Sequence, residues 1–253
     1  MNMRPKFVAL AVVGALAGAF GTSTAKADLI FQGVVTIGGT GLGAVDTILT
    51  MQSHGSGTVE SGQVSWGNCT PGPCTNVVTP DPNPPGFTPA GSTDMTGLNH
   101  TIAVSDTGWT GTQSLGIVFN PQEPGVGSGN NNITLNNLVM TIYNDTTGAT
   151  VFTAPWLDGP LSLAGLTGTG NSGYLFALNA IETDELLSSG ATGADRIGLL
   201  AYATNAQGGP ETFFGTVVAL PVPEPNSSAI LGTTLLALAG ISYVVRRRRE
   251  NDL

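Results

Sequence analysis

Short apolar segments alternate with stretches of glycine, asparagine, proline and threonine between residues 28 and 220. The clearest of these segments is Ile133–Tyr143. From Leu138 onward every second residue belongs to one face, and the turn residues of Asn144–Gly148 follow it. A period of two residues is the pattern of a strand with two different faces. This stretch therefore predicts a long half-buried strand that ends in a tight turn.

Ten segments of this kind are predicted as strands. They span residues 29–37, 45–51, 57–66, 101–105, 114–119, 133–143, 150–153, 173–179, 196–203 and 212–219. Many short strands separated by turn residues are typical of an antiparallel β-sandwich or jelly roll. We therefore expect an all-β fold, with one β-sandwich domain over residues 28–220.

One helix interrupts this pattern, with predicted bounds at Ala180–Leu187. Thr183 is the expected N-cap, and acidic residues near it suit the positive end of a helix. Gly190 is expected to end the helix. By contrast, Asn76–Ser92 contains five prolines, so we expect it to be loop.

The only two cysteines, Cys69 and Cys74, enclose the turn-forming segment Thr-Pro-Gly-Pro. A disulfide is expected if the protein reaches an oxidising compartment, and it would stiffen the tip of a hairpin. Metal binding is the alternative, but two thiols without a nearby histidine form an incomplete site.

The distribution of charge changes the picture of the whole chain. Its 253 residues include 36 glycines, and only 10% are charged, against about 25% in an average globular protein. Of the eight cations, Arg196 alone lies between residues 28 and 220, among fourteen carboxylates. Nucleic acids and anionic membrane surfaces are therefore poor partners for this acidic domain.

The N-terminus has the layout of a secretory signal peptide. A basic start is followed by the uncharged run Phe7–Phe20, and Ala25-Lys-Ala27 has the A-x-A pattern of a cleavage site. We expect residues 1–27 to be removed after Ala27 following export through the Sec machinery. A membrane anchor is the alternative, but fourteen residues reach only about 21 Å, less than the ~30 Å hydrocarbon core.

The C-terminus combines three parts in a fixed order within residues 221–253. Val222-Pro-Glu-Pro225 comes first, and the uncharged apolar run Ala229–Val245 is long enough for a short transmembrane helix. Four arginines follow directly. These are Arg246, Arg247, Arg248 and Arg249. Such a cluster stays on the cytoplasmic side of a membrane, so the acidic domain is expected on the outer side.

This order resembles the PEP-CTERM sorting signal of exopolysaccharide-producing Gram-negative bacteria. The resemblance implies that an exosortase, a membrane enzyme similar to a transpeptidase, recognises Pro223, Glu224 and Pro225 and releases the protein from its helix. Three later phrases also look like segments of other exported PEP-CTERM proteins. They are Gly173–Leu178, Asp195–Leu199 and Gly208–Phe214.

There are three other interpretations of this C-terminal segment: a plain membrane anchor behind a proline spacer, a Gram-positive sortase signal and a GPI signal. The sortase signal lacks its Leu-Pro-x-Thr-Gly motif in this chain. The terminal arginines argue against GPI anchoring. The plain anchor remains the alternative.

Candidate catalytic residues are sparse. His54 and His100 are the only histidines, and neither is accompanied by the Gly-x-Ser-x-Gly motif of a nucleophilic serine. The acidic cluster Glu182, Asp184 and Glu185 is the nearest approach to a glycosidase pair, but a helix start explains it better.

No cofactor is expected, with calcium as the one alternative. Asn144, Asp145 and Asp158 lie in predicted turns and carry oxygen ligands, but no EF-hand or nonapeptide spacing accompanies them.

Arg196 is either a clamp for an anion such as a uronic acid or the structural partner of a carboxylate. We expect the second, with Asp195, Glu211 or another of the fourteen carboxylates as the partner. The three tryptophans are Trp66, Trp109 and Trp156. They either stack on sugar rings or fill the core.

The sequence thus predicts a non-enzymatic exported protein of the cell surface or extracellular polysaccharide matrix, anchored in the inner membrane before sorting. A glycan-binding or adhesive module and a secreted hydrolase are the two alternatives. Exposed coplanar tryptophans in a groove would favour glycan binding. A cleft that joins His54 or His100 to an acid would favour an enzyme.

Overall fold

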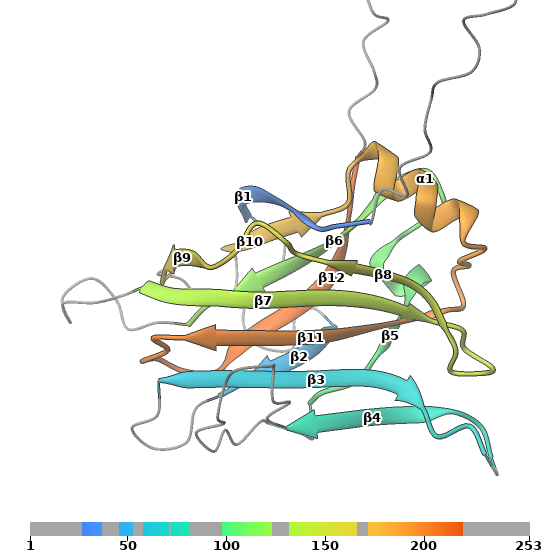
Figure 1. Ribbon diagram of the computed structural model, residues 1–253, viewed down its shortest axis with the longest axis horizontal. Helices are drawn as coiled ribbons and strands as arrows, with labels where there is room; N and C mark the ends of the chain where they lie inside the picture. Colours follow the sequence, from blue (N-terminus) through green and yellow to red (C-terminus); the bar gives the residue numbers. More distant parts are fainter. Residues whose placement is uncertain are drawn as a thin grey trace, which may run out of the picture.

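The protein folds into two antiparallel β-sheets with one α-helix, a β-sandwich-like arrangement (Figure 1). The computed structural model describes residues 27–36, 46–52, 58–70, 72–80, 98–122, 132–165 and 172–219. The predicted all-β class is confirmed. The predicted signal peptide and transmembrane helix lie outside the described residues, except for Ala27.

The first sheet has five strands in the order β1-β10-β6-β12-β2. Their bounds are Ile30–Thr36 for β1, Ser172–Ala177 for β10, Ser114–Asn120 for β6, Glu211–Val218 for β12 and Thr47–Met51 for β2. All neighbouring pairs are antiparallel. Strands β1 and β2 are consecutive in the chain, but they stand at the two ends of this order and so form opposite edges of the sheet.

The second sheet has the order β4-β3-β11-β7-β8, and β5 and β9 pair with β11 and β7. Its bounds are Thr75–Pro80 for β4, Val59–Gly67 for β3, Arg196–Thr204 for β11, Asn132–Tyr143 for β7, Thr150–Pro155 for β8, Ile102–Ala103 for β5 and Leu161–Ala164 for β9. A parallel bridge between Leu29 and Trp156 joins the two sheets along one side.

The main core lies between the sheets, because the largest buried cluster takes residues from both. Strand β7 illustrates how the sequence produces it. Ile133 and Leu135 are buried, and burial resumes at Leu138 after two half-buried residues. The ladder to β11 shifts register at this point, which identifies a β-bulge at Asn136. The bulge moves the alternation by one residue, so both halves of the strand bury their apolar face.

The helix α1, Ala180–Ser188, lies at one end of the five-stranded sheet (Figure 1). Its N-cap is Asn179, whose side chain accepts hydrogen bonds from the N–H groups of Ile181 and Glu182. The Glu182 carboxylate accepts a hydrogen bond from the N–H of Asn179 in return, which completes a capping box. The expected cap, Thr183, was wrong. Thr183 lies inside the helix and is buried, because the helix begins at Ala180, four residues earlier than an N-cap at Thr183 would require.

Two of the observed strands were not predicted, and one of them runs where we expected loop. Strand β4 covers the start of the proline-rich segment, and β9 lies in a region without a prediction. The first proline of the segment is Pro80, the last residue of β4. Strand β4 is an edge strand paired with β3 alone, and edges are where a sheet tolerates a proline. The prolines therefore mark the end of this strand and do not exclude it.

The chain enters and leaves the domain at the same end of the five-stranded sheet. The register places Ile30 opposite Ala177, Ala177 opposite Gly116 and Gly116 opposite Thr216. The first residues of β1 and the last residues of β12 therefore lie level with each other. Any segment attached at either terminus of the domain starts from this end.

Candidate functional site

Arg196 is the only lysine or arginine of the described residues, and it lies on an aromatic ring. The central carbon of its guanidinium is 4.7 Å from the centre of the Trp66 ring. Its Nε donates a hydrogen bond of 3.2 Å to the hydroxyl of Thr101, and Nη2 donates to the Thr101 carbonyl. The expected pairing with Asp195 or Glu211 was wrong. Within the described residues, a cation–π contact and Thr101 hold the guanidinium instead.

Trp66 connects this arginine to the turn between β7 and β8. Its indole N–H donates a hydrogen bond of 2.7 Å to the carbonyl of Asp145. Thr101 is tied to the same end of the sheet by Asn76, whose side-chain oxygen accepts from both the N–H and the hydroxyl of Thr101. Residues of the β3–β4 hairpin, the segment before β5 and the β7–β8 turn therefore meet near Arg196, the first residue of β11.

Cys69 and Cys74 form a disulfide at the tip of the β3–β4 hairpin. The tip packs against the β7–β8 turn, where the sulfur of Cys74 lies 3.1 Å from the carbonyl oxygen of Thr146. Gly148 packs against the sulfur of Cys69, because a Cβ added to this glycine would be 2.7 Å from that atom. Gly148 also has φ +67, a conformation that favours glycine. The disulfide therefore holds the hairpin tip in the shape that fits the turn.

Asp195 organises this turn through its two carboxylate oxygens. One accepts from the N–H of Asp145 at 3.3 Å and from the side-chain amide of Asn144 at 3.4 Å. The other accepts from the N–H and hydroxyl of Thr192 at 2.7 and 3.1 Å. Asp195 is buried, so these donors replace the water that the carboxylate loses.

The candidate calcium ligands do not gather around a common point. The side-chain oxygen of Asn144 accepts from the N–H and hydroxyl of Thr147, which makes it part of the turn. Asp158 is exposed and lies beyond β8. In the described part of the chain, no group of three or more histidine, cysteine, aspartate or glutamate side chains is placed to hold a metal ion.

The remaining candidates for catalysis are dispersed. His100 is exposed, and its Nδ1 lies 3.0 Å from the carbonyl of Leu98. His54 lies outside the described residues. Glu182 is buried in the capping box, whereas Asp184 on the same helix is exposed. Burial raises the pKa of the Glu182 carboxyl, and the neighbouring Asp28 acts in the same direction, although the hydrogen bond from Asn179 opposes both. These geometries suit a structural role in the helix start.

The three tryptophans have two different environments. Trp109 and Trp156 are buried in the main core, and Trp156 meets Phe176 edge to face at 5.5 Å between ring centres. Only Trp66 is half-exposed, and Arg196 lies over its ring. The structure therefore places no row of exposed tryptophans in the described residues.

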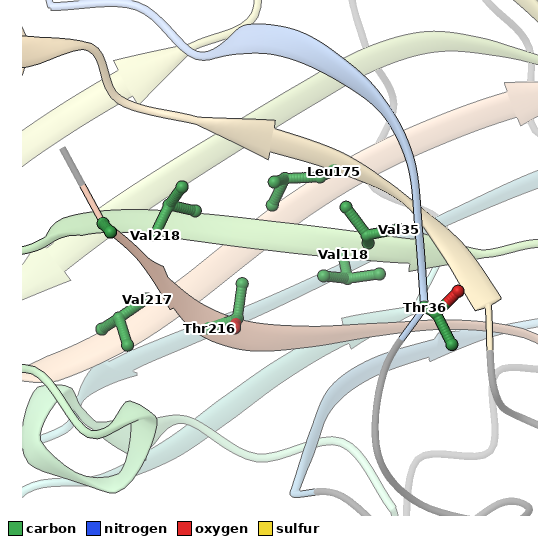
Figure 2. A pocket seen from close by; sticks show the side chains of 8 residues that line it. Val35, Thr36, Val118, Leu175, Thr216, Val217 and Val218 are labelled. Carbon is green, nitrogen blue, oxygen red and sulfur yellow. The ribbon is translucent and has the colours of Figure 1, made fainter. Parts of the chain in front are cut away.

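A second feature stands apart from this cluster: a hollow of about 390 Å³ on the five-stranded sheet (Figure 2). Its lining is mainly aliphatic. It consists of Val35, Thr36, Val118, Leu175, Thr216, Val217, Val218 and Ala219. Sequence reasoning missed this hollow, because alternate residues of β6 and β12 are apolar on both faces and so gave no clean inside–outside pattern.

The predicted sorting residues Pro223, Glu224 and Pro225 lie outside the described residues, as do Ala25 and the four terminal arginines. Ala27 is described and is buried at the edge of the core. Among the helices within the described residues, none has the length and apolar character needed to cross a membrane.

The chain matches no protein-family model, no curated protein and no solved structure.

Proposed function

We propose that this chain is an exported, non-enzymatic protein of the cell surface or extracellular matrix, delivered by a PEP-CTERM-type signal that an exosortase recognises and cleaves. The export machinery and the exosortase are its processing partners, and the membrane holds it through its C-terminal helix before processing. The extracellular polysaccharide is the environment in which the mature domain acts.

The observation that carries this proposal is the order of parts after the domain. A proline-flanked glutamate stands at 224, and a short polar segment at 226–228 follows it. An uncharged, mainly apolar run of seventeen residues at 229–245 and four arginines at 246–249 complete the order. The arginines orient the helix, and the prolines keep the segment before it extended. Recognition by an enzyme requires such an accessible stretch.

Three features of the folded domain support the proposal. Strand β12 ends at Val218, so the two sheets are complete before the sorting residues begin. The domain starts and ends at the same end of one sheet, which leaves its other end free to face outward. The disulfide between Cys69 and Cys74 belongs in an oxidising compartment such as the one outside the inner membrane.

Replacing residues 223–225 by alanines tests the proposal in a host that contains an exosortase. The variant should keep its C-terminal helix and accumulate in the membrane at the size of the uncleaved form. Pro221→Ala is the matched control, because it removes a neighbouring proline outside the motif and should leave processing intact. Unchanged size and location of the motif variant would favour the plain membrane anchor.

A further inference from the structure

Strand β1 is an edge strand whose outer side has no partner strand within the described residues. It pairs with β10 alone, and Figure 1 shows it at the margin of the five-stranded sheet. Its sequence, Ile-Phe-Gln-Gly-Val-Val-Thr, contains no charge and no proline. Edge strands often carry such residues, because these prevent another chain from adding a strand. β1 therefore presents an edge that a further strand can extend.

The other edges of the two sheets are obstructed or short. At β2 the side chain of Asn99 binds both the N–H and the carbonyl of Thr50, at 2.7 and 3.2 Å, as a neighbouring strand would. Strands β4 and β8 end in Pro80 and Pro155, and the Pro155 carbonyl already accepts from the N–H of Leu29. Strands β5 and β9 have two and four residues. Of the edge strands in the described part of the chain, β1 is the longest, with seven residues.

A β-bulge limits the part of β1 that a further strand can join. The register to β10 shifts between Phe31 and Gly33, so Gln32 is the extra residue. Gly33 has φ +96, a conformation that favours glycine at a bulge. The bulge bends the strand at this point, and regular pairing with β10 resumes over residues 33–36. These residues form the regular part of the open edge.

Val34 is the exposed apolar residue of this segment. It is paired with Tyr174, a residue of the main core, so the two lie on the same face of the sheet. Val34 is nevertheless 59% exposed, because no described strand lies beyond it. Val35 takes the opposite face and lines the hollow of Figure 2. A strand added at this edge would cover Val34 on one face and continue the aliphatic surface beside Val35 on the other.

The charge of the domain decides which strand suits this edge. Residues 28–220 contain fourteen carboxylates and one cation, so two copies repel each other wherever charged surfaces approach. β1 carries no charge, so this repulsion is least along its edge. A basic strand from another protein would gain nothing from an uncharged edge. An uncharged strand rich in β-branched residues matches it, and β1 is itself such a strand.

We infer that β1 pairs with β1 of a second copy of the chain, antiparallel and about a two-fold axis. Opposite residues of an antiparallel pair share a face, and a two-fold axis perpendicular to the sheet keeps each residue on its own face. The axis therefore passes through a residue. Centred on Val34, it sets the two Val34 side chains opposite each other and Gly33 opposite Val35. The exposed valine is then buried against an identical β-branched side chain.

The dimer is closed and weak. Because the other described edges are obstructed or short, pairing stops at two copies and does not propagate into a fibre. So short a ladder buries less than the roughly 1,200 Å² of a stable interface. Copies held close together on one surface associate through such a contact, because their effective concentration is high. This inference does not rest on the proposed sorting function.

The test is a charge swap at Val34, measured as the mass of the full chain in detergent micelles by analytical ultracentrifugation at rising concentration. The wild type should pass from one chain to two and no further. Val34→Glu and Val34→Lys each set like charges opposite each other, so each alone should raise the dissociation constant at least about tenfold, or about 1.4 kcal/mol. An equimolar mixture of the two variants should restore the dimer, because the opposed charges then attract each other.

Thr79→Glu is the matched control, since Thr79 is an exposed residue of the edge strand β4 and this variant should dimerise like the wild type. A wild type that stays a single chain at every concentration would overturn the inference. Dimers of equal strength in all variants would also overturn it, because the contact would then lie elsewhere in the chain. So would a mixture that fails to associate, because the two copies of residue 34 would then not be opposed. Each of these results leaves the sorting proposal standing.

Discussion

The guanidinium of Arg196 rests on the face of Trp66, with 4.7 Å between its central carbon and the ring centre. Both residues lie at the end of their strands, on β11 and β3, and the ring also reaches the β7–β8 turn through its N–H. The single cation of an acidic domain is thus used to join a hairpin to the sheet. A planar cation suits this place better than an ammonium group does.

Replacing Arg196 by lysine should lower the free energy of unfolding by about 1 kcal/mol, because lysine cannot stack and cannot make both bonds to Thr101. Urea titration of the wild type and the variant measures the change. In a Trp66→Leu background the same substitution should lower the free energy of unfolding by less, since the ring on which the guanidinium stacks is already absent. Equal costs in both backgrounds would assign the effect to Thr101 alone.

Gly148→Ala should destabilise the protein by more than backbone strain accounts for. Alanine at this position is strained by the positive φ of residue 148, and its methyl group would also collide with the sulfur of Cys69. Gly159→Ala is the matched control: Gly159 has φ +84 but nothing within 4 Å of an added Cβ. We expect a loss of about 1 kcal/mol for the control from strain, and a larger loss at 148. Similar losses at both positions would show that the turn and the disulfide are not in close contact.

Asn179→Ala should cost about 1 kcal/mol of stability, the usual effect of removing an N-cap side chain. The Asn179→Asp variant should retain most of this stability, because its carboxylate still accepts hydrogen bonds from the N–H groups of the first helical turn. Thr183→Val provides the contrast. Within the described residues the buried hydroxyl of Thr183 has no hydrogen-bond partner, so an isosteric apolar side chain should be neutral or stabilising. A large loss for Thr183→Val would contradict the assignment of the cap.

The stability of the protein should depend on pH through Glu182. Burial raises the pKa of its carboxyl above the ordinary value of 4.5, so the folded state binds this proton more tightly than the unfolded chain does. The resulting stabilisation is complete below the unfolded pKa and is lost as pH rises through the folded pKa. Glu182→Gln should therefore remove part of the decline in stability between acid and neutral pH.

Asp184→Asn, on an exposed position of the same helix, is the matched control for that experiment. Its stability should follow the same pH dependence as the wild type across this interval. A Glu182→Gln variant with the wild-type slope would contradict the assignment, and the measurement is urea denaturation at several pH values.

The sequence predicted most of the strands because their patterns are local. Nine of the ten predicted segments differ from an observed strand by no more than two residues at either end, and the tenth, 101–105, holds a two-residue strand followed by the 3-10 helix Val104–Thr107. The two strands that were missed are short and have a single partner strand each. Strand β4 pairs with β3 beyond a disulfide turn, and β9 consists of four residues that pair only with β7.

The environment of Arg196 could not be predicted in the same way. Asp195 and Glu211 were reasonable partners on charge alone, but Asp195 is occupied by Thr192 and the β7–β8 turn. Trp66 is 130 residues away along the chain and reaches Arg196 only because β3 lies beside β11. Strand order, which periodicity does not encode, decided this contact.

The intact mass of the mature protein, together with its location in an exosortase-containing cell, shows whether the domain is exported and then released from its C-terminal helix. We predict a chain outside the inner membrane that begins at Asp28, lacks residues 229–253 and is two hydrogens lighter than the free-thiol form because Cys69 and Cys74 are bonded. A membrane-bound chain whose mass still includes Arg246–Arg249 would show that no exosortase cleaves it.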